Sequence, residues 1–362
     1  MSDAPTPRNV PPAQEAASRL LADYAVTKGV ADELFDATGA MRPVWSEFIA
    51  ELSRLSPDEV AAHFARGARY LRDAGVFFRQ YSADPQQERD WPLSHVPVLL
   101  HEREWATICE GLTQRAELLE RVVADLYGPG TLVRDGHLPA ELVARNPEWL
   151  RPMVGVAPAS GHYLHLLAFE IGRSPDGSWL VLGDRAQAPS GAGFALENRM
   201  ATARIFPEPF PRANVRRLAG FFRAFREAMD ALPGARGGRT AILTPGPGTD
   251  TYFEHAYIAR YLGLTLLEGE DLLVENGAVN VRTVSGPKRL GALWRRMDAV
   301  FADPLELDET SRIGTPGLVD ALRQSNVNMV NALGSGILET RALMAFLPRI
   351  ARHLLGERLR LP

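Results

Sequence analysis

The sequence of 362 residues predicts a mixed α/β protein, and three patterns support that prediction. Between residues 15 and 150, apolar residues recur at the spacing of three and four that is typical of amphipathic helices. Two apolar runs around Pro175-Asp176-Gly177 predict an antiparallel hairpin. Beyond residue 239, strand, helix and strand patterns alternate, which predicts a parallel sheet.

The composition argues against several classes of protein. The formal net charge is -4 and the isoelectric point is near 6.1, whereas proteins that bind nucleic acid or anionic membranes usually carry a basic excess. Cys109 is the only cysteine, so no disulfide can form within the chain. No stretch approaches the roughly 20 apolar residues of a membrane span, and the first residues lack the pattern of a secretory signal. We therefore expect a cytoplasmic protein that binds neither nucleic acid nor membrane.

The N-terminal region is predicted to be helical from residue 15 to residue 150, after a proline-rich tail at 1–14 that we expect to be disordered. Ser56 followed by Pro57 and two acidic residues is a strong helix start, because serine caps the first amides and proline suits the first turn. This predicts a helix over Pro57–Asp73. A second long helix is predicted over Glu102–Leu126.

The hairpin at 163–184 is expected to close with a two-residue turn at Asp176-Gly177. That register sets Glu170 opposite Gly183 and puts Arg185 on the same face as Glu170, with Asp184 on the opposite face. The loop Pro189–Gly193 follows, and its small residues and free amides could approach an anion closely. A flexible connection without a ligand is the alternative.

The C-terminal region, 239–362, is predicted to alternate between strands and helices. An Asn276-Gly277 turn predicts a second hairpin there. The other predicted strands are Thr240–Thr244, Leu264–Leu267, Leu293–Asp298 and Asn326–Ala332, and the predicted helices are Val215–Leu232, Thr251–Leu262, Pro316–Gln324 and Ile337–Leu355. The polar residues Arg295, Arg296, Asp298 and Asn331 fall at strand ends, where open α/β sheets place their ligands. Either they bond one another inside the protein or they form a substrate pocket.

The segment Thr244–Gly248 resembles a dinucleotide-binding turn between a strand and a helix. Glu268 follows it at about the separation along the sequence that is typical of the acidic residue that binds a ribose hydroxyl. Thr251 stands in place of the third glycine, and two prolines remove amides that would hold a pyrophosphate. A tight turn without a ligand is therefore favoured. An oxidoreductase is the lower alternative for function.

Several runs together resemble a known family: GRSPDGSW at 172–179, DRAQAPSGAGFALENR at 184–199, RR-x-D at 295–298, DPLEL at 303–307 and NALGSGILE at 331–339. The chain resembles the circularly permuted ATP-grasp proteins (type 2), related to ligases of the glutathionylspermidine-synthetase type, from about residue 77 to residue 362. The resemblance implies a partial ATP-grasp lobe at 151–232, carrying the hairpin, and a Rossmann-like unit at 239–362. It also implies that the C-terminal lobe of the family is missing here.

The resemblance implies an ATP-dependent ligase that joins a carboxylate to an amine through an acyl phosphate, with ATP and Mg²⁺ as cofactors. Small-molecule or peptide acids and amines would be its partners, and a second lobe could be supplied in trans. Relatives carry an acid on the first hairpin strand and Glu-x-Asn on the second, and here these positions are Glu170, Gly183 and Arg185. Either Asp184 and Gln187 take over the metal, or Arg185 bonds Glu170 and replaces the cation.

The residues that we assign on this basis fall into three groups. The metal ligands are Glu170 and Asp184; the catalytic residues are Arg199, Arg296 and Asp298; the cofactor-binding residues are Arg185, Gln187, Ser190, Gly191, Gly193, Asn331 and Ser335. Arg199 would anchor a phosphate or a substrate, or it would simply lie on a solvated helix start. A non-catalytic binding or structural protein derived from an ATP-grasp enzyme is the alternative to the ligase, and the chain alone is expected to be inactive.

Overall fold

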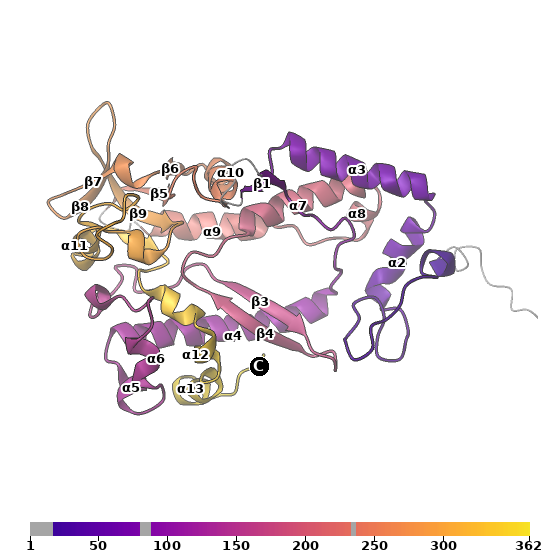
Figure 1. Ribbon diagram of the computed structural model, residues 1–362, viewed down its shortest axis with the longest axis horizontal. Helices are drawn as coiled ribbons and strands as arrows, with labels where there is room; N and C mark the ends of the chain where they lie inside the picture. The colour runs from indigo at the N-terminus through magenta and orange to yellow at the C-terminus, as the bar shows by residue number, and fades with distance from the viewer. Residues whose placement is uncertain (1–16, 80–87, 233–236) are drawn as a thin grey trace, which may run out of the picture.

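The computed structural model describes residues 17–79, 88–232 and 237–362. It shows a mixed fold of helices and sheets, as the sequence predicts (Figure 1). The predicted disorder at 1–14 lies outside the described residues. No helix within the described ranges is long and apolar enough to cross a membrane.

The N-terminal part contains α2 (Pro43–Leu52), α3 (Pro57–Asp73) and the long α4 (Glu102–Tyr127). The predicted start of α3 is confirmed: the Ser56 hydroxyl accepts from the Glu59 amide, and the Glu59 carboxylate accepts from the Ser56 amide. Two short antiparallel strands, β1 (Phe77–Arg79) and β2 (Glu88–Asp90), interrupt the predicted helical region. The short elements α5 (Thr131–Arg134), α6 (Ala140–Ala144) and η1 (Arg151–Met153) follow α4.

The hairpin is formed by β3 (Ala168–Arg173) and β4 (Trp179–Arg185). Its turn is not the predicted two-residue turn, because the Ser174 amide donates to the Ser178 carbonyl and three residues lie between them. A bulge at Leu182 adds one residue to β4 and shifts the register. Glu170 therefore lies opposite Gly183 after all, as predicted.

Three helices follow the hairpin: α7 (Ala192–Ile205), α8 (Pro209–Arg212) and α9 (Ala219–Ala231). α7 begins inside the glycine-rich loop, where Gly191 adopts a positive φ of 116° at the N-cap. α7 packs against α3, so these two helices form a layer above the hairpin in Figure 1. The sequence did not predict this helix, because the apolar residues of α7 show little amphipathic periodicity.

The main sheet contains four parallel strands in the order β6 (Thr265–Leu267), β5 (Arg239–Leu243), β9 (Lys288–Arg295) and β10 (Asn328–Val330). Helix α10 (Tyr252–Leu262) connects β5 to β6. The second hairpin, β7 (Leu272–Glu275) and β8 (Ala278–Val281), turns at Asn276-Gly277 as predicted. β8 pairs with the start of β9 in antiparallel orientation, so β9 begins earlier than predicted. β9 also ends earlier than predicted, at Arg295.

The C-terminal segment differs from the single closing helix predicted at Ile337–Leu355. After η4 (Ala299–Phe301) and α11 (Leu318–Arg323), it forms η5 (Ser335–Glu339), α12 (Arg341–Met344) and α13 (Leu347–Leu354). Pro348 lies in the first turn of α13, where its missing amide costs nothing, whereas inside a continuous helix it would remove a hydrogen bond. The prediction of one helix is therefore wrong.

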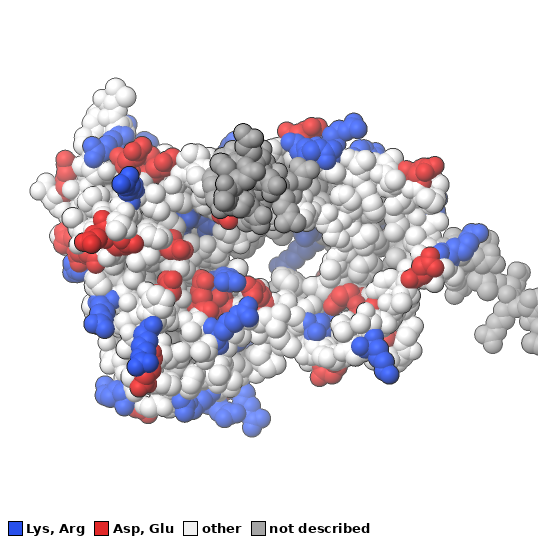
Figure 2. Space-filling view, in the orientation of Figure 1, with Lys and Arg blue, Asp and Glu red and all other residues white. Residues whose placement is uncertain are grey.

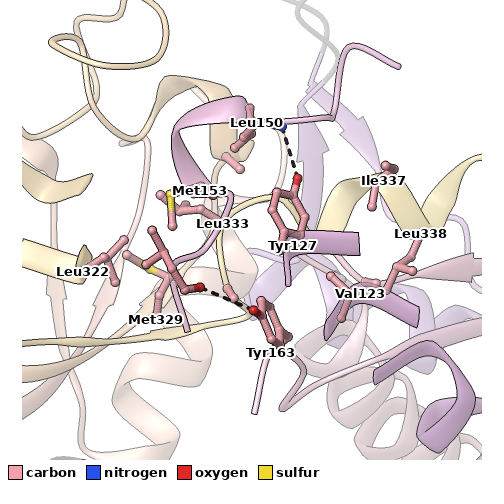
Figure 3. Packing of buried hydrophobic residues seen from close by; sticks show 14 of the residues in the cluster. Val123, Tyr127, Leu150, Met153, Tyr163, Leu322, Met329, Leu333, Ile337 and Leu338 are labelled. Atoms are coloured by element: carbon pink, nitrogen blue, oxygen red, sulfur yellow. Dashed lines mark hydrogen bonds between the residues drawn. The ribbon is translucent and has the colours of Figure 1, made fainter. Parts of the chain in front are cut away.

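One hydrophobic core joins the N-terminal and C-terminal regions. It includes Val123 and Tyr127 of α4, Met329 of β10, and Ile337 and Leu338 of η5 (Figure 3). The Tyr127 hydroxyl is satisfied within this core, because it accepts a hydrogen bond from the Leu150 amide at 3.1 Å. This core includes residues on both sides of positions 150 and 232, where the sequence predicts boundaries between units. The division of the chain into those units stays a prediction.

Candidate functional site

The site lies where the four parallel strands end. Their carboxyl ends share one edge of the sheet, as in other open α/β sheets. The polar residues at or just after these ends are Thr244, Glu268, Arg295, Arg296 and Asn331. The glycine-rich loop reaches the same edge: the Arg296 guanidinium donates to the Pro189 carbonyl at 2.7 Å and to the Ser190 hydroxyl at 2.9 Å. The fold thus brings together the predicted residues Arg296 and Ser190.

A carboxylate from α10 occupies the loop amides. Glu254 Oε1 accepts from the Gly191 amide at 2.7 Å and from the Gly193 amide at 3.0 Å. Its Oε2 lies 3.4 Å from the Arg296 guanidinium, and both side chains are buried. We call Glu254, Arg296 and the loop 189–193 the loop clamp. The loop does bind an anion, as its composition suggests, but here the anion is a side chain of the protein itself.

His255 extends the loop clamp toward β5. Its Nδ1 lies 2.9 Å from the Thr244 hydroxyl and its Nε2 lies 3.2 Å from the Thr251 hydroxyl. Burial, together with the nearby positive charge of Arg296, lowers the pKa of His255 to about 2. The imidazole is therefore neutral near neutral pH. Hydrogen bonds within the protein thus join α10 to the end of β5, where the sequence resembles a dinucleotide-binding turn.

Arg295 is fully buried beside the loop clamp. It donates to the carbonyls of Met297 and Gln187, the latter at 2.8 Å, and its Nε has no hydrogen-bond partner among the described residues. Burial lowers the pKa of Arg295 to about 10, although the carboxylate of Asp298 opposes this shift. The guanidinium stays charged at neutral pH and needs negative charge nearby.

Three carboxylates supply that charge: Glu148, Asp298 and Glu339, which we call the acidic group. Burial raises the pKa of the half-buried Glu148, and the negative charges of Asp298 and Glu339 raise it further. The Glu339 carboxylate accepts from the amides of Ala186 at 2.8 Å and Gln187 at 2.6 Å. The acidic group therefore surrounds the segment that joins the hairpin to the glycine-rich loop.

Gly336 shows how tightly this part of the site is packed. A Cβ atom at this position would lie 2.5 Å from Glu148 Oε2 and 3.1 Å from Gln187 Oε1. The Gln187 amide oxygen also accepts from the Ala299 amide at 2.9 Å. Gln187, predicted as a cofactor-binding residue, is buried and bonded to protein atoms on both sides.

The exposed end of the hairpin carries an ion pair. Arg185 donates to the Glu170 carboxylate from Nε at 2.9 Å and from Nη2 at 2.5 Å, and it also lies 3.6 Å from Glu339. Of the two alternatives drawn from the sequence, the structure shows the one in which Arg185 bonds Glu170. Figure 2 shows acidic and basic side chains gathered around β3 and β4, beside a hollow in the surface.

Asp184 points to the other face of the hairpin. It is buried and forms a bidentate pair with Arg115 of α4, at 2.6 Å and 2.7 Å. The structure thus separates the two predicted metal ligands and gives each an arginine partner. Among the described residues, no group of three histidine, cysteine or acidic side chains could hold a metal ion. Glu170 and Asp184 therefore do not form a joint magnesium site.

Four other predicted residues lie apart from the loop clamp or are already bonded. Asn331 accepts from the His165 and Leu166 amides and donates to two carbonyls, so it joins β10 to the start of the hairpin. The Ser335 hydroxyl is buried and has no hydrogen-bond partner among the described residues. Arg199 lies on α7 and donates to the Arg216 carbonyl at 3.4 Å. Asp298 is exposed and belongs to the acidic group.

Glu254, Glu148 and Arg115 were not predicted from the sequence. Glu254 and Arg115 are charged residues that lie in predicted helices and are fully buried, and nothing in a single sequence marks a charged helix residue as buried. Glu148 lies in a short loop before Trp149, with no local pattern. Glu339 was within the run NALGSGILE, so the family resemblance could have pointed to it.

Comparisons with known proteins agree with the resemblance. A sequence model of the family described as circularly permuted ATP-grasp type 2 matches residues 97–362. An uncharacterized protein of Synechocystis sp. is 33% identical over 328 residues, which are 90% of this chain and 68% of the relative. Two uncharacterized proteins of Mycobacterium tuberculosis are 35% and 33% identical and also cover 90% of this chain. The chain spans 38% and 59% of those two relatives.

Among solved structures, a glutathione synthetase-like effector from Globodera pallida superimposes with a TM-score of 0.47 and 13% identity. The superposition covers 74% of this chain and 64% of the effector, and a likeness this weak adds nothing to the assignment. The family model covers most of the chain and contains all the residues of the loop clamp and the acidic group. The chain belongs to the circularly permuted ATP-grasp type 2 family.

Proposed function

We propose that this chain acts in an ATP-dependent ligase that joins a carboxylate to an amine. The observation that carries the proposal is the family match over 97–362, because the charged residues at the ends of the parallel strands lie within that range. In such a reaction the carboxylate attacks the terminal phosphate of ATP and releases ADP. The amine then attacks the acyl phosphate, and an amide and phosphate are formed.

The acidic group suits the amine half of this reaction. An amine is protonated at neutral pH and must lose a proton before it can attack. Glu148 is half-buried and its pKa is raised by burial and by Asp298 and Glu339, so it is the best proton acceptor in the group. Asp298 and Glu339 would attract the ammonium. Arg295 would keep the three carboxylates from repelling one another.

The two predicted metal ligands do not lie together. Glu170 and Asp184 lie on opposite faces of the hairpin and both bond arginines, as described above. The loop amides of Gly191 and Gly193 also donate to Glu254 and are not free for phosphate. These contacts favour the second candidate function, a non-catalytic protein that keeps the fold.

Amine-dependent release of ADP separates the two candidates. The purified chain is incubated with ATP, magnesium and a panel of carboxylates and amines, and ADP and phosphate are measured. We expect release that requires both an acid and an amine, and amide formation detected by mass spectrometry; this outcome would correct the expectation, drawn from the family resemblance, that the chain alone is inactive. Release of no ADP with any pair would support the non-catalytic protein.

The Glu148→Gln variant tests the residue that accepts the proton. We expect its kcat to fall by about 100-fold or more, since general bases contribute 10²–10⁴-fold. In the parent protein, kcat/KM should rise with pH through a pKa above that of an ordinary glutamate, and the variant should lose this rise. Glu141→Gln, an exposed glutamate in α6, is the matched control and should leave kcat unchanged.

A further inference from the structure

The acidic group occupies a position that its own charges oppose. Burial raises the pKa of Glu148, and the carboxylates of Asp298 and Glu339 raise it further. The charged form of Glu148 would therefore be more stable in water, away from the other two carboxylates. The positive charge of Arg295 offsets only part of this repulsion. Other contacts of the fold must hold the Glu148 segment in place.

Asn146 supplies two of these contacts. Its Oδ1 accepts from the Glu148 amide at 3.0 Å, and its Nδ2 donates to the Thr340 hydroxyl at 2.6 Å. Thr340 directly follows Glu339 in the chain. Asn146 and Thr340 are 194 positions apart, so one side chain joins two distant segments, each of which carries a member of the acidic group. We call this pair of hydrogen bonds the Asn146 bridge.

The surroundings of the Asn146 bridge strengthen it. Asn146 and Thr340 are both half-buried. The other residues that line the same small pocket are all apolar: Leu126, Leu138, Leu142, Val143, Ile337 and Leu343. A hydrogen bond beside apolar groups is stronger than one in water, and breaking it would leave two polar groups without partners. The bridge should therefore stay formed.

Tyr127 supports the Glu148 segment from its other side. The Tyr127 hydroxyl accepts from the Leu150 amide at 3.1 Å (Figure 3). It also lies 3.4 Å from the Glu148 carbonyl oxygen. Tyr127 belongs to the hydrophobic core, so its removal would change the packing as well. Asn146 is the better probe, because it links Glu148 to the residue that follows Glu339.

We propose that Asn146 is a positioning residue, which holds the carboxylates of Glu148 and Glu339 at a fixed separation through Thr340. With the bridge in place, Glu148 cannot move away from Glu339 toward water. Without it, the two carboxylates can separate, and the pKa of Glu148 falls toward that of an ordinary glutamate. The bridge itself rests on the two hydrogen bonds, whereas its importance for catalysis rests on the proposed function, in which Glu148 accepts a proton.

Titration of Glu148 in the full chain tests the bridge without turnover. The glutamate side-chain carboxyl groups are labelled with ¹³C, and the NMR signal of Glu148 is identified by its absence in Glu148→Gln. We expect the pKa of Glu148 to fall by about one unit in Asn146→Ala, because like charges that can separate perturb each other less. A thermal unfolding scan establishes that the variant is folded. An unchanged pKa in the folded variant would overturn the proposal.

Thr340→Val tests the other end of the bridge, and it serves the same purpose if Asn146→Ala does not fold. Valine keeps the shape of threonine and removes the hydroxyl, which makes no capping bond to α12. We expect the pKa of Glu148 to fall here too, and Thr340→Ser, which keeps the hydroxyl, to retain the parent value. A fall in Asn146→Ala with no change in Thr340→Val would overturn the bridge.

Asn326→Ala is the matched control. Asn326 is also a half-buried asparagine, and its Nδ2 donates to the Gly277 carbonyl at 3.0 Å. It lies just before β10, at the amino end of the parallel strands, whereas Asp298 follows the carboxyl end of β9. Its removal should leave the pKa of Glu148 unchanged. An equal fall in Asn326→Ala would show that general loosening lowers this pKa, and it would overturn the specific role of Asn146.

The titration and the turnover assay separate this proposal from the proposed function. In an active ligase, Asn146→Ala should move the rise of kcat/KM with pH to lower pH by the same amount as the pKa of Glu148. A bridge-dependent pKa in a protein that releases no ADP with any acid and amine would support the bridge and contradict the ligase. An active ligase in which Glu148 titrates alike in the parent protein and in Asn146→Ala would support the ligase and overturn the bridge.

Discussion

Two ion pairs lie at opposite ends of the segment that joins the hairpin to α7, and their side chains differ strongly in solvent exposure. In the loop clamp, the side chains of Arg296 and Glu254 are 2% and 1% exposed. In the hairpin, those of Arg185 and Glu170 are 51% and 41% exposed. The buried pair has little freedom to change partners, because each group is also bonded to the loop. The exposed pair can separate at small cost and bind other charges.

This difference shows which charged residues the fold itself requires. Removing one partner of a buried pair leaves an uncompensated charge, which is strongly destabilising. Removing one partner of an exposed pair leaves a charge that water can solvate. The loop clamp should therefore determine stability, and the hairpin pair should be available for function. Four substitutions or conditions test this contrast.

The largest effect is expected for Glu254→Ala. It leaves the buried Arg296 without a counterion and the Gly191 and Gly193 amides without an acceptor. We expect the free energy of unfolding, measured with urea, to fall by about 3–5 kcal/mol. The two amides should also exchange hydrogen slowly in the parent protein and rapidly in the variant. Slow exchange would contradict the flexible connection that the sequence left open as an alternative for this loop.

Glu306→Ala is the control for Glu254→Ala. Glu306 pairs with Arg323 on an accessible surface. Its removal should cost less than about 1 kcal/mol. A loss of similar size in the two variants would mean that burial does not distinguish the two kinds of pair.

Asp184→Asn should have the next largest effect, about 3 kcal/mol. The substitution leaves the buried Arg115 with one neutral acceptor in place of a bidentate carboxylate. Removing the arginine as well, in Asp184→Asn/Arg115→Met, should restore part of the stability. If Asp184 were instead a magnesium ligand, magnesium would raise the melting temperature of the parent protein and not that of Asp184→Asn.

Acid should destabilise the protein through His255, which adjoins the loop clamp. Its pKa is about 2 in the folded protein and near 6.5 in an unfolded chain. Below pH 6.5 the unfolded chain binds a proton that the folded protein does not, so stability falls as the pH falls. The loss should be about 1.4 kcal/mol per pH unit between about pH 5.5 and about pH 3, where the unfolded chain is protonated at this histidine and the folded protein is not.

The variant His255→Asn measures the contribution of this histidine. Its free energy of unfolding should change less with pH over the same range than that of the parent protein. Parallel curves for the two proteins would show that other groups cause the loss in acid.

The sequence predicted those parts of the fold that depend on local chemistry. The capping residues Ser56-Pro57 predicted where α3 begins, and Asn276-Gly277 predicted the second hairpin turn. At the first hairpin the turn was predicted wrongly, yet the contact between Glu170 and Arg185 was predicted correctly. The bulge at Leu182 compensates for the longer turn, and no residue in the sequence marks it.

Most of the site could not be predicted, because its contacts join residues that are distant in the chain. Glu254 is more than 60 residues from the loop that it binds, and Arg115 is almost 70 residues from Asp184. The predicted residues Arg296, Ser190, Gly191 and Gly193 do meet, but an unpredicted glutamate holds them together. Strand-end position was a useful signal, since parallel strands bring their carboxyl ends to one edge.

The smallest effect on stability is expected for Glu170→Gln, and it tests the exposed side of the comparison. The substitution removes the counterion of Arg185 on an accessible surface, where Glu339 lies 3.6 Å away and can take part of its place. We expect the free energy of unfolding to change by less than about 1 kcal/mol. The change should become smaller still in high salt, since salt screens exposed charges.

The same variant shows whether the hairpin pair takes part in function. If Arg185 is held by Glu170 until an anionic substrate arrives, Glu170→Gln frees the guanidinium and should lower the KM for the carboxylate while leaving stability unchanged. Arg185→Gln should raise that KM with an equally small effect on stability. Unfolding energies that fall by about 3 kcal/mol in either variant would place this pair with the buried ones. In that case, exposure would not separate the charges that the fold requires from those available for substrate.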